Sequence, residues 1–264
     1  MLTVVKNQIK ISFLSIKYAL IKESLNKVTF ITSILFMILN NSSFIIQWLI
    51  FFSLKDNIGG YNMNKVLLLW ALASGTFGFS HFFFKNSYNL SNIITNGKLD
   101  AYLVMPKNVL LSAITTDVES SGIGDILYGY IILFISGITI PKFILFTFFT
   151  ITGGLIMTSI AVILGSLSFW FKKTDTIAEI GNSFITHFAT YPDGIFKGIT
   201  KMLLYTVIPV GIVSYIPIEI ITKFNLSLTL TIVLVTALLV TLSFVIFNRG
   251  LKRYSSSNLM IARI

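Results

Sequence analysis

The side chains that could do chemistry in this chain are few and lie far apart in the sequence. Only 11% of the 264 residues are charged, cysteine is absent, and the only two histidines are His81 and His187. Without cysteine there is no thiolate nucleophile and no disulfide. The histidines stand in neither an HExxH nor an HxH spacing, so no metal site is predicted. These observations disfavour a membrane-embedded enzyme.

Three acidic residues gather at the start of one apolar segment: Asp117, Glu119 and Asp125. Acidic side chains favour the N-terminal end of a helix dipole, and Thr116 or Asp117 could cap such a helix. The functional alternative is a hub of salt bridges between these carboxylates and the lysine-rich N-terminus. No substrate pocket for acid–base catalysis is indicated here.

A second group of polar residues falls inside apolar segments, where polar side chains are costly. Asn40 and Asn41 could hydrogen-bond between helices or line a transport path. Glu179 and His187 could pair within such a path. The neighbouring Lys172 and Lys173 leave open that Glu179 is a surface charge.

The most informative loop runs from Gly97 to Pro106. Gly97 can end one helix, and Pro106 forces a further break. A helix of about two turns is expected between them, exposing Lys98, Asp100 and Tyr102. It could fit a groove on a water-soluble partner, or it could be an ordinary connection.

The elements that must position these residues are membrane-spanning helices. The chain is 55% hydrophobic with a mean hydropathy of +0.85, and its apolar runs approach 20 residues without the alternation of a β-barrel. The net charge of +10 comes from basic residues that flank these runs. That placement indicates membrane orientation and contact with anionic lipid, not nucleic acid. The apolar segments are 28–52, 66–84, 122–140, 143–171, 176–191, 203–221 and 226–247.

One of these segments is not expected to cross the membrane. Both termini are basic, which favours an even number of crossings with both ends in the cytoplasm. Pro209 and Pro217 interrupt 203–221, so 192–221 is interpreted as a re-entrant or interfacial element on the extracellular side. An alternative is that 176–221 forms one helical hairpin in which neither arm spans fully. Close helix packing is predicted at the glycines of two spans, namely Gly75, Gly78, Gly153, Gly154 and Gly165.

The fold prediction is therefore a single all-α integral membrane domain over residues 1–264. Residues 1–27 form an amphipathic interfacial helix, with Ile9, Phe13, Ile16 and Leu20 opposite Lys6, Lys10 and Lys17. Residues 28–247 form a six-span bundle, and 248–264 form a basic cytoplasmic tail. No cleavable signal peptide is recognised in 1–27.

Several stretches resemble one family, in the same order along most of the chain. Residues 94–106 (ITNGKLDAYLVMP), which include Leu99, are similar to the G-x-L-D-x-x-L-x-x-P stretch of bacterial ABC-2-type exporter permeases. Residues 124–129 (GDILYG) resemble the start of the family's third span. Residues 188–196, Ile208-Pro209 and 214–217 resemble its YP…IF…IP…Y-x-P region. The particular likeness is to short permeases of the daunorubicin-resistance-like subgroup.

The resemblance implies a permease subunit of an ATP-driven exporter in a bacterial plasma membrane. Two such chains, identical or similar, would enclose a path for a hydrophobic or amphipathic cargo (drug, peptide or lipid-like). ATP and Mg would be held by two separate ATPase subunits, which would contact the N-terminal helix and the 97–106 loop. In agreement, the chain contains no GxxxxGK[ST] phosphate loop.

The resemblance also suggests a gate on the extracellular side. Its residues would be Tyr191, Pro192, Pro209, Tyr215 and Pro217, which could equally form a rigid plug. The alternative function for the whole chain is an ion- or proton-coupled secondary transporter. Such carriers use central intramembrane charges and inverted repeats, and neither is evident in this sequence.

Overall fold

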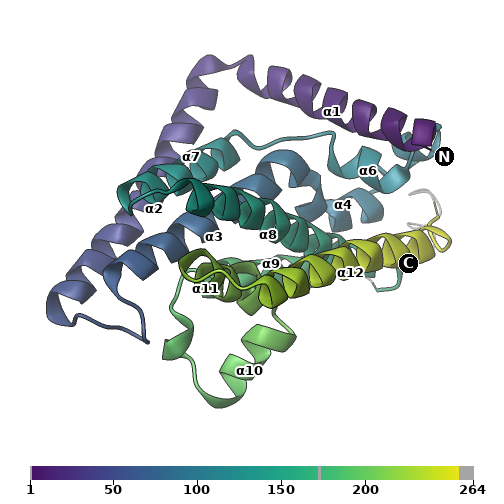
Figure 1. Ribbon diagram of the computed structural model, residues 1–264. Coiled ribbons are helices and arrows are strands. Elements are labelled where there is room, and N and C mark those ends of the chain that lie inside the picture. The colour runs from purple at the N-terminus through teal and green to yellow at the C-terminus, as the bar shows by residue number, and fades with distance from the viewer. Residues whose placement is uncertain (1, 172–173, 256–264) are drawn as a thin grey trace.

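The computed structural model describes residues 2–171 and 174–255, and over these ranges the chain is helical without a β-strand, as predicted (Figure 1). Lys172, Lys173 and the end of the basic tail, 256–264, lie outside the described residues. The α-helices are α1 (Leu2–Ser24), α2 (Lys27–Leu54), α3 (Met63–Tyr88), α4 (Leu90–Thr95), α5 (Asp100–Leu103), α6 (Val109–Ile114), α7 (Ser120–Ile135), α8 (Ile140–Ser166), α9 (Asp175–Phe188), α10 (Gly198–Thr206), α11 (Ile216–Thr222) and α12 (Leu226–Leu251). Two 3-10 turns, η1 (Leu167–Phe169) and η2 (Asp193–Ile195), and a π-helical turn, η3 (Gly211–Tyr215), complete the elements.

Four helical stretches of the described chain are long and apolar enough to cross a membrane. They are Lys27–Leu54, Met63–Thr95, Ile140–Phe169 and Leu226–Leu251. Helices α7 and α9 have 16 and 14 residues, fewer than the roughly 20 that a perpendicular crossing needs. The multi-pass architecture is thus confirmed, whereas the count of six spans stays a prediction.

The interruption predicted in segment 203–221 is present. Helix α10 and the stretch Gly211–Thr222 are bent by 72° relative to each other, and would add a fifth candidate span if they cross together. The bend falls around Pro209, between α10 and η3. Pro217, in contrast, stands at the start of α11, directly after the π-helical turn η3, and the helical stretch Gly211–Thr222 continues through it.

Helix α3 lies at the centre of the bundle and packs against both α7 and α8, as its many buried residues indicate. The predicted close packing at glycines is confirmed. A Cβ added to Gly153 of α8 would lie 2.8 Å from the Cγ2 atom of Thr76. Close packing also occurs at Gly129 of α7, which was not among the predicted glycines: a Cβ added there would lie 2.6 Å from the carbonyl oxygen of Ala71 on α3. Helix α12 covers α8, and α2 covers α7 (Figure 1).

Helix α1 stands apart from the bundle along much of its length (Figure 1). Ile9 and Phe13 are exposed, as an interfacial helix requires, and Gln8 and Ala19 are buried against the rest of the chain. The start of α1 and the end of α12 lie toward the same side of the molecule, together with α4 and α6 (Figure 1). The number of crossings and the side of the membrane on which the termini lie stay predictions.

Candidate functional site

A polar cluster lies where α2, α3 and α7 meet. Asp125 of α7 is only 3% exposed. Its Oδ1 atom accepts a hydrogen bond from Nδ2 of Asn41 on α2 at 2.6 Å. Ser74 of α3 donates to the main-chain oxygen of Asp125 at 2.8 Å, and Tyr128 donates to the main-chain oxygen of Asn41 at 3.2 Å. The cluster therefore joins three helices through buried polar contacts.

Two glycines allow this close approach. A Cβ on Gly78 of α3 would lie 2.6 Å from the Cβ of Asp125, and one on Gly124 would lie 2.6 Å from the carbonyl oxygen of Ile34 on α2. Real Cβ atoms do not approach other atoms so closely. The absence of side chains at these positions is thus what brings the carboxylate of Asp125 within reach of Asn41.

The second carboxylate oxygen of Asp125, Oδ2, has no hydrogen-bond partner among the described residues. A buried polar atom without a partner costs on the order of 1–3 kcal/mol, and charge on it raises that cost. Asp125 borders a cavity of about 270 Å³ whose lining also includes Asn40, Asn41 and His187. This cavity brings together three of the residues predicted for a path.

A second cavity, of about 430 Å³, adjoins the first along α9. Phe77, Thr186 and His187 line both cavities, and Glu179 and Asp175 line the second. The predicted pairing of Glu179 with His187 is not seen among the described residues, although both side chains border the same hollow. The polar face of α9 therefore follows the two cavities from one to the other.

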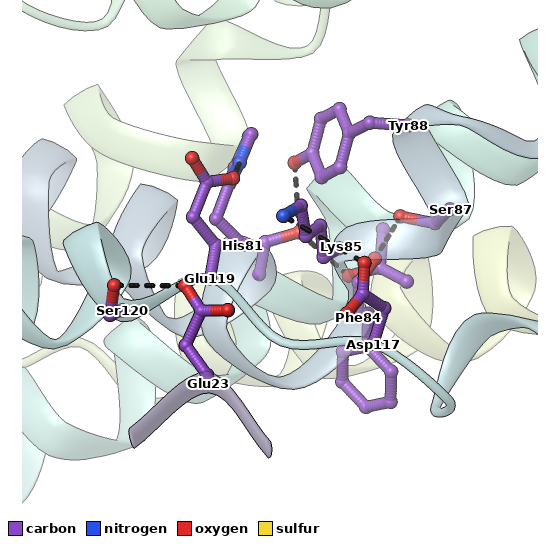
Figure 2. Close-up of polar contacts among 11 residues, drawn as sticks. Glu23, His81, Phe84, Lys85, Ser87, Tyr88, Asp117, Glu119 and Ser120 are labelled. Atoms are coloured by element: carbon purple, nitrogen blue, oxygen red, sulfur yellow. Dashed lines mark hydrogen bonds and ion pairs between the residues drawn. The ribbon is translucent and has the colours of Figure 1, made fainter. Parts of the chain in front are cut away.

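The other acidic residues lie apart from Asp125, on the segment that precedes α7. The carboxylate of Asp117 is 3.8 Å from Nζ of Lys85, and that of Glu119 is 3.4 Å from Nδ1 of His81 (Figure 2). The hydrogen bond from His81 lowers the pKa of Glu119 below its usual value. His81 itself lies between the rings of Phe77 and Tyr88, with both ring centroids 4.0 Å away.

The prediction that these carboxylates form salt bridges with the lysines of α1 is therefore wrong. The cations that pair with Asp117 and Glu119 belong to α3, and α1 contributes an acidic residue instead. Glu23 accepts a hydrogen bond from Ser120 at 3.1 Å (Figure 2). The reason is geometric, because the last turns of α3 lie directly beside the segment before α7.

The 97–106 segment has a shorter helix than predicted, and two of the three side chains predicted to be exposed are partly buried. Gly97 has φ of +71°, as expected for a helix-ending glycine, but α5 makes only one turn and not two. Leu99 is fully buried, and Tyr102 hydrogen-bonds Thr116 at 2.9 Å. Lys98 and Pro106 are exposed, whereas Asp100 and Tyr102 are partly buried.

The apolar side chains at the end of α5 and directly after it are exposed. The exposed fractions are 42% for Leu103, 84% for Val104 and 44% for Met105. Helix α1 reaches the same region, since the side-chain oxygen of Gln8 accepts a hydrogen bond from the main-chain nitrogen of Asn108 at 2.9 Å. Residues 103–105 are called the apolar tip below.

The segment between α9 and α10, which contains two of the predicted gate residues, is held by Asp193. The sequence analysis did not select this residue. Asp193 forms a 2.8 Å ion pair with Lys201 and accepts a hydrogen bond from Tyr205 at 3.0 Å. Burial raises the pKa of Asp193, but the hydrogen bonds from Lys201, Tyr205 and Tyr61 outweigh it, so the pKa lies below its usual value. The only signal in the sequence was the position of Asp193 directly after Pro192.

Among the predicted gate residues, Pro192 directly precedes Asp193, and the ring of Tyr215 packs on Tyr205, which donates a hydrogen bond to Asp193. Tyr191 packs on Trp48 of α2 with the ring centroids 6.0 Å apart. Tyr215 is buried and donates to the main-chain oxygen of Phe188 at 2.8 Å. Pro192 precedes η2, and Pro209 precedes η3.

Comparison with known proteins identifies the family. A family model described as "ABC-2 family transporter protein" matches residues 36–258, which include α3 to α12 and most of α2. No curated protein and no solved structure matches the chain. The matched range contains the Asp125 cluster, the apolar tip and the Asp193 contacts. The chain accordingly belongs to the ABC-2 transporter family, whose members are multi-pass membrane permeases of ABC transporters.

Proposed function

We propose that the chain is the membrane-spanning subunit of an ATP-driven exporter in a bacterial plasma membrane. Its cargo is a hydrophobic or amphipathic molecule such as a drug, a peptide or a lipid-like compound. Two separate ATPase subunits hold ATP and Mg, and a second permease chain, identical or similar, completes the path. Both termini lie in the cytoplasm on the side of the ATPases.

The observation that carries this proposal is the apolar tip. Val104 is 84% exposed between two polar stretches, on a segment that buried Leu99 and the Tyr102–Thr116 hydrogen bond hold in place. Apolar side chains exposed on a fixed segment favour contact with another protein. The Gln8–Asn108 hydrogen bond ties α1 to the same region, so a movement of the docked ATPase would reach both α1 and the bundle.

Co-purification with an ABC ATPase that is encoded beside this chain tests the proposal. Placing a charge at the centre of a protein interface costs 2 kcal/mol or more in many cases. We therefore expect Val104→Asp to reduce recovery of the ATPase by about tenfold or more. Val207→Ser and Val104→Ser serve as a matched pair, because Val207 is 70% exposed on the part of the chain that contains α10.

In this pair, only the change at Val104 should weaken the complex. Full transport by this chain in proteoliposomes that lack ATP would contradict the proposal. That result would instead favour the second candidate, an ion- or proton-coupled transporter. The buried carboxylate of Asp125 is the observation in favour of it, since such carriers use intramembrane acids. An imposed pH gradient, with and without ATP, separates the two.

A further inference from the structure

Two residues that line the same cavity each carry a buried polar atom without a hydrogen-bond partner among the described residues. One is Oδ2 of Asp125, a hydrogen-bond acceptor, and the other is Nε1 of Trp70, a hydrogen-bond donor. Neither has a partner among the described residues, and the two side chains belong to residues 3% and 7% exposed. Both residues line the cavity of about 270 Å³ between α2, α3, α7 and α9. An acceptor and a donor left unpaired beside one cavity indicate a place for a ligand.

The rest of the lining defines what such a ligand must look like. Phe44 stacks on Trp70 with the ring centroids 4.9 Å apart, and Met37, Met157 and Tyr191 add apolar surface. Mostly apolar pockets with a few well-placed polar groups are typical of small-molecule sites. The ligand body should therefore be apolar and aromatic.

The charged groups that line the cavity favour a ligand with a positive charge. None of the described residues that line the cavity is a lysine or an arginine, and Asp125 is the one carboxylate among them. The Oδ1 atom of Asp125 is already held by Asn41 at 2.6 Å, so Oδ2 is the atom left for a ligand. A protonated amine satisfies a buried carboxylate by both charge and hydrogen bonding. The aromatic faces beside it favour a cation further.

We infer that this cavity binds an amphipathic organic amine. Its ammonium group contacts Oδ2 of Asp125, its aromatic body lies against Phe44 and Trp70, and an acceptor such as a carbonyl or sulfonyl oxygen receives the Nε1–H of Trp70. A simple metal cation would leave the Trp70 donor unpaired, which is why the organic amine is the better match. That the amine is also exported rests on the proposed function, whereas its binding does not.

Binding of a fluorescent amine to the purified chain in lipid nanodiscs tests this inference. The probe is dansylcadaverine, which carries a primary amine and sulfonyl oxygens, and the matched control probe is its N-acetylated, uncharged form. Binding is measured from the dansyl emission after subtraction of the signal from empty nanodiscs. We expect the wild-type chain to bind the amine at least about tenfold more tightly than the acetylated probe.

Variants assign the effect to the two unpaired atoms. Asp125→Asn keeps the shape of the side chain and should weaken amine binding about tenfold or more, and Trp70→Phe should weaken it about threefold to tenfold. Asp117→Asn removes a carboxylate outside the cavity and should leave the affinity unchanged. Equal affinity for the two probes in the wild-type chain, or an equal effect of Asp125→Asn and Asp117→Asn, would overturn the inference.

The test also holds if Asp125→Asn does not fold, because the two probes are compared on the wild-type protein. No ATPase is present in the assay. A failure to bind the amine therefore leaves the exporter proposal standing, and a failure of the ATPase to co-purify leaves the amine site standing.

Discussion

Two aspartates of this protein are held in opposite ways. Asp193 is engaged by Lys201, Tyr205 and Tyr61, so that its charge is paired with a cation and its carboxylate accepts hydrogen bonds. Asp125 is more deeply buried, receives its side-chain bonds on one oxygen only, and has no cation beside it among the described residues. Both are acidic residues next to apolar helices, but their surroundings give them different tasks.

The comparison separates a residue that stabilises the fold from one that is available to a ligand. A paired and hydrogen-bonded carboxylate contributes to the free energy of unfolding, whereas a buried oxygen without a partner reduces it. A position that is maintained at a cost in stability points to function. The Asp193 contacts thus form a lock between the α2–α3 turn and α10, and the Asp125 cluster forms a binding position.

The largest effect is expected where the lock is packed most tightly. An added Cβ at Gly194 would overlap the carbonyl group of Gly59 in the α2–α3 turn. Gly194→Ala should lower the free energy of unfolding by roughly 3 kcal/mol, measured by urea titration in mixed micelles. Gly60→Ala is the control, since its Cβ meets no atom within 4 Å and only its φ of +82° is unfavourable, a cost of about 1 kcal/mol.

If the two glycine variants were equally stable, the turn and η2 would not be locked together. The claim that the contacts around Asp193 stabilise the fold would then fail.

Removal of the charge in the lock should have the next largest effect. Asp193→Asn weakens the ion pair with Lys201, whose side chain is 44% exposed, so solvent screening limits the loss to about 1 kcal/mol at pH 7. Because the folded-state pKa of Asp193 is lowered, this contribution is present above the unfolded pKa of about 3.9. It is lost as the pH falls through the folded pKa.

The difference in stability between the wild-type and Asp193→Asn chains at pH 7 should therefore shrink when the pH is lowered to about 3, below the unfolded pKa. Thermal unfolding followed by circular dichroism at both pH values measures this. A difference that persists unchanged at low pH would contradict the assignment of the effect to the charge of Asp193.

The smallest change in stability, and one of opposite sign, is expected at the binding position. Asp125→Asn retains the shape of the side chain and removes a buried ionisable carboxyl group with an unpartnered oxygen, so the free energy of unfolding should stay within about 0.5 kcal/mol or rise by up to about 1 kcal/mol. The same urea titration measures it, with Asp117→Asn as the exposed control. A loss as large as that of Asp193→Asn would show that Asp125 is a structural residue.

The helical fold could be predicted from the sequence because long apolar runs determine it. Apolar composition identified the segments that became α2, α3, α8 and α12, and Pro209 identified the interruption before α11. The glycines of α3 and α8 identified places of close helix packing, although not the helices that meet there. Each of these features acts locally, within one helix or between two neighbours.

The candidate site could be predicted only in part. Asn41 and Asp125 were selected as polar residues near or within apolar segments, but their 2.6 Å contact depends on Gly78 and Gly124, which set the distance between helices. Trp70 gave no signal, because a tryptophan in an apolar run looks like any lipid-facing or core residue. The partners of Asp117 and Glu119 were assigned to α1, since charge alone cannot tell which of several basic helices lies nearby.

The shortness of α7 has a consequence for the surrounding bilayer. Its 16 residues rise about 24 Å, against a hydrocarbon thickness of about 30 Å. Under the prediction that α7 crosses the membrane, the bilayer must become thinner where this helix faces lipid, and the thinned region would lie next to the amine site. The protein should accordingly be most active in membranes of short-chain phospholipids, and lengthening the chains by a few methylene groups should slow it.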